Sequence, residues 1–130
     1  MSGQSFLRGI HHVSLKTDDP ERFEEALRFY RDLLGCRIDR RWDAGVLLDT
    51  GGGWIEIFSN GPGIADKGAV RHAALAVTDT DALAARLEAA GYPCFLGPRD
   101  LVIPSDPPLR ARIAFLRGPL GEEIELFQEM

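Results

Sequence analysis

A duplicated segment is the feature that most constrains how this chain can fold. Residues 10–19 (IHHVSLKTDD) align with residues 70–79 (VRHAALAVTD) at a constant offset of 60 residues, and the alignment superimposes His12 on His72. A segment repeated at the spacing of a small supersecondary unit indicates two copies of one structural module.

A second repeated segment lies near the end of each copy. Residues 52–58 (GGWIEIF) align with residues 121–127 (GEEIELF) at an offset of 69 residues, which superimposes Glu56 on Glu125. Each half of the chain is therefore predicted to open with a strand that carries a histidine and to close with a strand that carries a glutamate. Imidazole and carboxylate groups suit divalent first-row metals. The duplication predicts a site of two histidines and two glutamates: His12, Glu56, His72 and Glu125.

Strand periodicity places the glutamates on one face. Side chains alternate along a strand, so Glu56 shares its face with Trp54 and Phe58, while Ile55 and Ile57 occupy the aliphatic face. A buried carboxylate without a partner costs roughly several kcal/mol, a cost that a metal or cation removes. Taken singly, a strand glutamate usually just faces solvent. The metal hypothesis therefore depends on the duplication.

His11 adjoins His12 and is the alternative ligand. Alternation predicts that His11 lies on the opposite face, together with Val13 and Leu15. The repeat offset selects His12.

The same order of elements is predicted in both halves. Strands are expected over 9–17, 36–42, 45–50, 53–59, 69–77, 94–97, 101–103, 110–117 and 122–128, with helices from Asp19 to Gly35 and over 79–91. Asp19 is a predicted N-cap, followed by Pro20 at the first helical position. Residues 60–68 form the expected linker. The segment Leu96–Pro108, with four prolines, is predicted to be irregular and is a candidate loop over a site.

Composition limits the classes of partner. The 130 residues fit one domain (1–130), and 45% hydrophobic with 27% charged residues is ordinary for a globular protein. A net charge of −5 argues against nucleic acid or an anionic membrane as a partner. Neither a signal peptide nor a membrane span is predicted. Cys36 and Cys94 are interpreted as reduced thiols, so a cytoplasmic location is expected.

In this arrangement the chain resembles the vicinal oxygen chelate superfamily, which includes glyoxalases, bleomycin resistance proteins and dioxygenases. The resemblance covers about residues 8–129. It is carried by IHHV at 10–13 with Asp19, FYRDLLG at 29–35, the Glu56 strand, HAALAV at 72–77 with Asp79, and GPLGEEIEL at 118–126. It implies an α+β fold of two βαβββ modules, about 8–60 and 68–129, whose mixed sheets curl into an open, barrel-like cavity with the helices outside.

Within the superfamily, the His/Glu/His/Glu set most resembles that of bacterial glyoxalase I-like lyases (lactoylglutathione lyases). The resemblance implies that a small-molecule substrate, the hemithioacetal of methylglyoxal and glutathione, is isomerised to a thioester through a metal-bound enediolate. Glu125, with Glu56 as its counterpart, would transfer the proton. The cofactor would be one divalent ion: Ni, Co, Zn, Mn or Fe. A homodimer is expected, and the four ligands meet either within one chain or across that dimer.

Four residues are candidates for binding the substrate. Asn60 stands four residues after Glu56, where similar lyases have an asparagine that contacts glutathione. Lys16 replaces the family's arginine, which keeps the charge but loses bidentate geometry. Trp54 lines an apolar cavity or fills the core. Arg112 binds a substrate carboxylate or is a solvated charge at a sheet edge.

Other functions on the same fold remain as alternatives. A metal-free drug-binding or resistance protein generally lacks the complete ligand set. An extradiol dioxygenase uses two histidines and one glutamate in a longer chain, and an acyl-CoA epimerase usually has glutamine as its second ligand. Glu56 argues against the last two.

Overall fold

The structure, a computed structural model, contains a βαβββ order in both halves, with the two strands predicted at 94–97 and 101–103 joined into one. It describes Phe6 and residues 8–64 and 68–130, so part of the expected linker, residues 65–67, lies outside the described residues. The first module consists of β1 (His12–Lys16), α1 (Pro20–Arg28), a π-helical turn η1 (Phe29–Leu33), β2 (Arg37–Trp42), β3 (Gly45–Asp49) and β4 (Trp54–Phe58). The second consists of β5 (Ala73–Ala76), α2 (Thr80–Ala89), β6 (Cys94–Ile103), β7 (Leu109–Arg117) and β8 (Glu123–Glu129).

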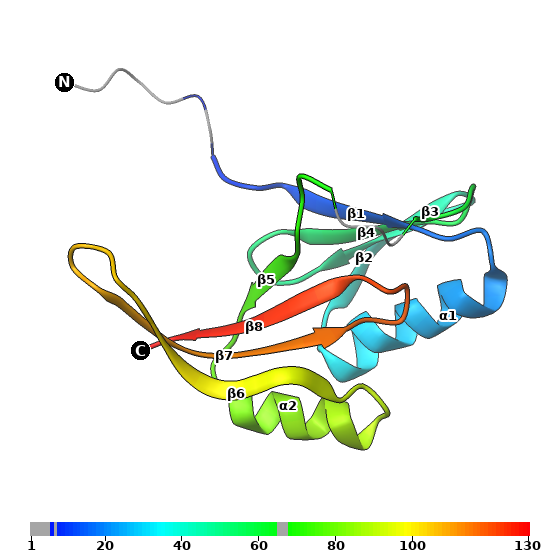
Figure 1. The fold of residues 1–130 in the computed structure, drawn as a ribbon. Helices are drawn as coiled ribbons and strands as arrows, with labels where there is room; N and C mark the ends of the chain where they lie inside the picture. Colours follow the sequence, from blue (N-terminus) through cyan, green and yellow to red (C-terminus); the bar gives the residue numbers. More distant parts are fainter. Residues whose placement is uncertain (1–5, 7, 65–67) are drawn as a thin grey trace.

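Each module forms one four-stranded mixed sheet. The strand orders are β1-β4-β3-β2 and β5-β8-β7-β6. In each sheet the first strand pairs in parallel with the last, and the other pairs are antiparallel. This topology makes the histidine strand and the glutamate strand of each module neighbours. It also leaves β1 and β5 at the edges of their sheets, among the strands described (Figure 1).

Both helices begin directly after the aspartates at 19 and 79 that their sequence suggests as N-caps. The Asp19 side chain accepts a hydrogen bond from the backbone N–H of Glu21, and Pro20 opens α1. Asp79 caps α2 in the same way, by accepting from Ala82. Gly35 follows η1 with a φ of +80°, a conformation that suits glycine and ends the helical segment.

The two helices and the aliphatic faces of both sheets share one core. It includes Leu27, Leu48, Ile57, Leu87 and Leu126, all at most 1% exposed. Figure 1 shows α2 lying beneath the second sheet, with α1 to its side. None of the helices in the described ranges is long and apolar enough to cross a membrane.

Side chains also join the modules through their helices. The ring of Phe29 contacts that of Tyr92 at 4.7 Å between centroids, and Tyr92 Oη donates to Glu25 Oε2 at 2.8 Å. Because Ile55 and Ile57 pack into the core, Glu56 on the same strand must lie on the face turned away from the helices.

The predicted irregular segment Leu96–Pro108 is mostly strand, so that prediction was wrong. β6 runs without a break to Ile103, and only residues 104–108 connect it to β7. Pro98 is accommodated because β6 is an edge strand whose register shifts between Leu96 and Arg99. The resulting hairpin has strands of 10 and 9 residues, whereas the equivalent β2 and β3 have 6 and 5.

Candidate functional site

The first histidine and the first glutamate meet on neighbouring strands. Parallel pairing of β1 with β4 sets His12 beside Trp54 and Ser14 beside Glu56. His12 Nε2 lies 3.3 Å from Glu56 Oε1, and the Glu56 side chain is 15% exposed. Both side chains lie on the face turned away from the helices.

The second module repeats this arrangement. β5 pairs with β8 so that Ala74 lies beside Glu125, and His72 Nε2 lies 3.1 Å from Glu125 Oε1. Glu125 is buried, and the ring of Phe115 meets that of His72 edge-on at 5.1 Å between centroids. The two His–Glu pairs are therefore equivalent in position and in geometry.

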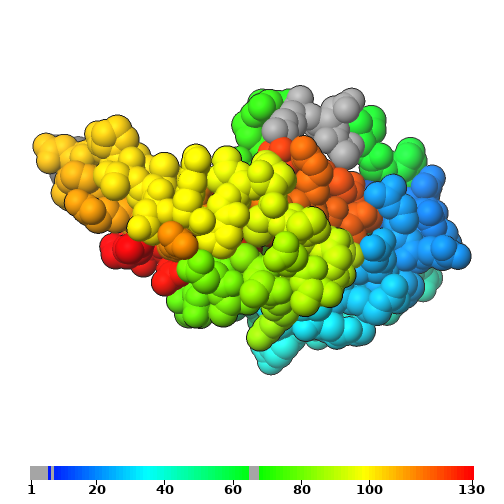
Figure 2. Space-filling view, turned by 60° about the horizontal axis from the view of Figure 1, so that its bottom comes forward, coloured from blue at the N-terminus to red at the C-terminus, as the bar shows by residue number. Residues whose placement is uncertain are grey.

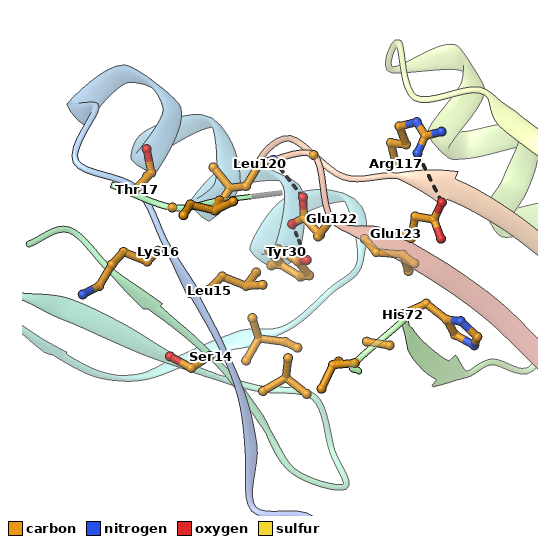
Figure 3. A pocket seen from close by; sticks show the side chains of 18 of the residues that line it. Ser14, Leu15, Lys16, Thr17, Tyr30, His72, Arg117, Leu120, Glu122 and Glu123 are labelled. Carbon is orange, nitrogen blue, oxygen red and sulfur yellow. Dashed lines mark hydrogen bonds and ion pairs between the residues drawn. The ribbon is translucent and has the colours of Figure 1, made fainter. Parts of the chain in front are cut away.

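The fold of one chain does not bring the two pairs together. Among the residues that the structure describes, no group of three or more histidine, cysteine, aspartate or glutamate side chains gathers closely enough to hold a metal. A cleft of about 930 Å³ separates β1 from β5. Figure 3 shows this cleft, with Ser14, Leu15 and Lys16 on one side and His72 on the other.

The donor atoms of each pair fit half of a metal site. Each pair offers one imidazole nitrogen and one carboxylate, donor types that suit zinc and the other divalent first-row metals. A site with four protein ligands needs both halves.

His11 is not on the opposite face, so that prediction was wrong. β1 begins only at His12, and strand alternation therefore does not extend to His11. The His11 ring stacks on Trp54 at 4.5 Å, and its Nδ1 lies 2.9 Å from His12 Nδ1. This contact leaves His12 Nε2 directed at Glu56. A ring that hydrogen-bonds the second nitrogen of a metal-binding histidine fixes that ligand's orientation.

Two of the candidate substrate residues share the face of His12. Lys16 pairs with Phe58, and its Nζ lies 5.8 Å from the centre of the Phe58 ring. Trp54 is partly buried, and its Nε1 donates to Asp39 Oδ2 at 3.1 Å. Asn60 is exposed just beyond the end of β4.

Arg112 lies away from the site. Pairing of Phe115 with Glu125 and of Arg112 with Gln128 places Arg112 on the helix side of β7. There its guanidinium binds Asp81 of α2 and Asp100 of β6. The hydrogen bonds from Arg112 hold the pKa of Asp81 below its usual value. The prediction that Arg112 binds substrate is therefore not supported by its position.

The sequence did not indicate one further polar contact, at the bottom of the cleft. Tyr30 Oη donates to Glu122 Oε2 at 2.7 Å, and the backbone N–H of Leu120 donates to Glu122 Oε1 at 2.8 Å (Figure 3). Burial raises the pKa of Glu122, and burial followed by the nearby Glu122 charge raises that of Tyr30. This contact ties the first module to the β7–β8 turn of the second.

The known proteins that this chain resembles share its fold. The family model described as the Glyoxalase/Bleomycin resistance protein/Dioxygenase superfamily matches residues 9–126. An uncharacterized protein, YaeR, from Escherichia coli K12 is 27% identical over 95% of this chain and 98% of its own length.

Two solved structures show the same fold. The trypanothione-dependent glyoxalase I of Leishmania major superimposes with a TM-score of 0.70 at 22% identity, over 94% of this chain and 87% of that chain. A lactoylglutathione lyase from Agrobacterium tumefaciens superimposes with a TM-score of 0.64 at 19% identity, over 94% of both chains.

Proposed function

The chain belongs to the glyoxalase/bleomycin resistance protein/dioxygenase superfamily, and from this premise we propose that it is a metal-dependent lyase of the glyoxalase I type. Its reaction would isomerise the hemithioacetal of a 2-oxoaldehyde and a thiol to a 2-hydroxy thioester. The observation that carries the proposal is the His–Glu pair, present at the same register in both modules. The fold shared with a lactoylglutathione lyase and a glyoxalase I supports it.

We further propose that a second copy of the chain completes the site. Both β1 and β5 stand at sheet edges, beside the cleft that separates the pairs. Four exposed apolar side chains line this cleft, with exposed fractions from 36% to 83%: Ile10, Val13, Ile64 and Val70. Exposed apolar residues gathered around a cleft are typical of an interaction surface. A symmetric dimer that joins β1 of one copy to β5 of the other would form two identical four-ligand sites.

In the proposed reaction the substrate would be polarised by the ion, and the glutamates would transfer the proton. His12, Glu56, His72 and Glu125 would hold a divalent ion, which would supply Lewis-acid polarisation of the substrate carbonyl. The carboxylate of Glu125 accepts the proton from the carbon that bears the hydroxyl and the sulfur. Glu125, with Glu56 as its counterpart, would then return this proton to the adjacent, former carbonyl carbon, while the hydroxyl proton moves to the oxygen on that carbon. Glu125 is buried beside the Phe115–His72 ring contact, so little of its carboxylate side of the site is open to water.

The first test is metal analysis of the purified protein, followed by a thioester-formation assay with methylglyoxal and glutathione. The proposal expects one bound ion for each pair of half-sites and a rate above background. A metal-loaded protein with no rate on any 2-oxoaldehyde–thiol adduct would reject the lyase. A protein that binds no metal but retains an apolar drug would favour the resistance-protein alternative.

The second test asks whether the half-sites join across chains. His12→Ala and His72→Ala each remove one half-site, so each pure variant should be inactive. Mixed after dissociation, the two chains form heterodimers in which one of the two sites is intact. Random pairing should restore about a quarter of wild-type activity, since half of the dimers are mixed. No restoration would mean that the four ligands meet within one chain.

A further inference from the structure

The turn between β7 and β8 is bound by side chains of the other module. Arg22 of α1 donates through Nη2 to the backbone carbonyl of Pro119 at 3.0 Å, and Tyr30 of η1 donates to Glu122 at 2.7 Å. Figure 2 shows the contact at the surface, where the orange end of β7 lies against the blue of α1. The helical segment of the first module therefore holds a turn that belongs to the second sheet.

The equivalent turn of the first module is closed by its own residues. The repeat aligns Glu122 with Gly53, so the turn between β3 and β4 has a glycine at this position. There the Thr50 N–H donates to the carbonyl of Gly53 at 2.9 Å, and the Thr50 hydroxyl donates to the same oxygen. The fold that the two modules share therefore does not require a carboxylate at position 122.

The Glu122 carboxylate lies within its own turn. It packs against Gly118, where an added Cβ atom would overlap the carboxylate, and the Leu120 N–H donates to its Oε1 at 2.8 Å. The Gly118 N–H closes the turn by donating to the Glu122 carbonyl at 2.7 Å. The amides of Gly118 and Leu120 therefore report directly on whether the turn is closed.

Charged and titratable groups face Glu122 from α1, from η1 and from the segment after α2. Burial raises the pKa of Glu122, and the hydrogen bonds from Tyr30 and from backbone N–H groups, together with the charge of Arg22, offset only part of this effect. Tyr92, which follows α2, donates to Glu25 instead, although the Glu122 charge also reaches it. The closed turn therefore favours the protonated carboxyl, because the carboxylate loses more hydration than its donors replace.

This turn and the residues that hold it line the cleft between β1 and β5. Arg22, Tyr30 and Glu122 all belong to this lining, and Figure 3 shows Glu122 between Tyr30 and Leu120. We propose that Glu122 is a proton-operated latch, which holds the turn against the first module when protonated and lets it open into the cleft when ionised. The latch needs neither a metal nor a second copy of the chain, so it is independent of the proposed function.

The direction of the pH effect follows from the two pKa values of Glu122. In the open turn the side chain is hydrated and has the ordinary pKa of a glutamate, about 4.3. In the closed turn the pKa is raised by burial. The closed form is therefore favoured most below the ordinary pKa, and this advantage is lost as the pH rises through the raised pKa.

The test is amide hydrogen exchange, followed by NMR between about pH 4 and about pH 8. Each rate is divided by that of an unstructured chain, which removes the intrinsic pH dependence of exchange. Protection of the Gly118 and Leu120 amides should fall at least about threefold as the pH rises. The Thr50 amide is the matched control and should keep its protection, because the Gly51 N–H lowers the pKa of the neighbouring Asp49, which stays ionised.

Two variants assign the effect to the latch. Glu122→Gln cannot ionise but can still form hydrogen bonds with Tyr30 and the Leu120 N–H, so protection should become independent of pH. Tyr30→Phe removes a donor that supports the ionised carboxylate. Its protection at about pH 8 should be lower than that of the wild type by roughly tenfold or more, with a smaller difference at about pH 4.

Three results would overturn the proposal. Wild-type protection of Gly118 and Leu120 that stays constant or increases with pH would show that ionisation does not open the turn. An equal pH dependence in Glu122→Gln would assign the effect to another group, and an equal change at Thr50 would assign it to the whole fold. The wild-type series requires no variant, so it tests the latch even if a variant does not fold. Failure of the metal or thioester assays would leave the latch unaffected.

Discussion

Removal of the Tyr30 hydroxyl should destabilise the protein in a pH-dependent way. Tyr30 is 2% exposed and donates to the Glu122 carboxylate at 2.7 Å. Tyr30→Phe removes the side-chain donor to this carboxylate and leaves it with backbone N–H donors, that of Leu120 among them. Loss of a buried hydrogen bond to a charged group costs about 1.5–3 kcal/mol. For a chain of this size, that corresponds to a decrease in melting temperature of about 5–10 °C.

The direction of the pH effect follows from the raised pKa of Glu122. Burial makes the folded state favour the protonated carboxyl, so this contribution to stability is present at low pH and is lost as the pH rises through the folded pKa. Above that pKa the carboxylate depends on the Tyr30 donor, because the hydrogen bond lowers the cost of its charge. The loss caused by Tyr30→Phe should therefore be largest near about pH 8 and shrink toward about pH 4, where an ordinary glutamate begins to protonate.

The assay is urea unfolding of wild type and variant across that pH range, with Tyr92→Phe as the control. Tyr92 also donates to a glutamate, Glu25, at 2.8 Å, but it is only partly buried; burial raises the pKa of Tyr92 to about 12. The control should lose no more than about 1 kcal/mol, with little pH dependence. An equal loss in both variants, or a loss for Tyr30→Phe that grows as the pH falls, would refute the reasoning.

Three other substitutions test the site. His11→Ala should weaken zinc binding by about 10–100-fold in a competition titration, because it frees the His12 ring, while unchanged affinity would show that the contact does not orient the ligand. Glu125→Gln should keep part of the bound metal, measured by elemental analysis, and lose roughly 10²–10⁴-fold in turnover, since an amide does not accept the substrate proton; full activity would remove Glu125 from the mechanism. Arg112→Ala should leave KM unchanged, because the guanidinium binds Asp81 on the helix side, and a raised KM would place Arg112 at the substrate.

The repeat predicted the order of the elements because both copies carry the same pattern, and the capping signals predicted the helix starts because they depend on neighbouring residues. Asp19 and Gly35 mark the two ends of the first helical segment, as expected. Two predictions were wrong, and both depended on strand boundaries that the sequence does not show. Pro98 and its neighbours predict a loop by local propensity, whereas the edge position of β6 lets this proline lie in a strand. The face predicted for His11 assumes a strand alternation that begins only at His12. Substrate binding by Arg112 stays a prediction, although its pairing in β7 places it on the helix side. The repeat places one histidine and one glutamate in each module, but the distance between the two pairs depends on how the modules pack.

If two chains share the site, as proposed, the separation of the two His–Glu pairs within one chain links metal binding to the association of chains. Since the chain by itself does not assemble the four ligands, an ion held by four ligands binds only the associated form and stabilises it by mass action. The apparent affinity for metal would then increase with protein concentration, and a chelator would promote dissociation. In a dilute solution the protein would lose its ion at a free-metal level that leaves a concentrated solution fully loaded. Activity per chain would consequently fall on dilution, and added metal would restore it.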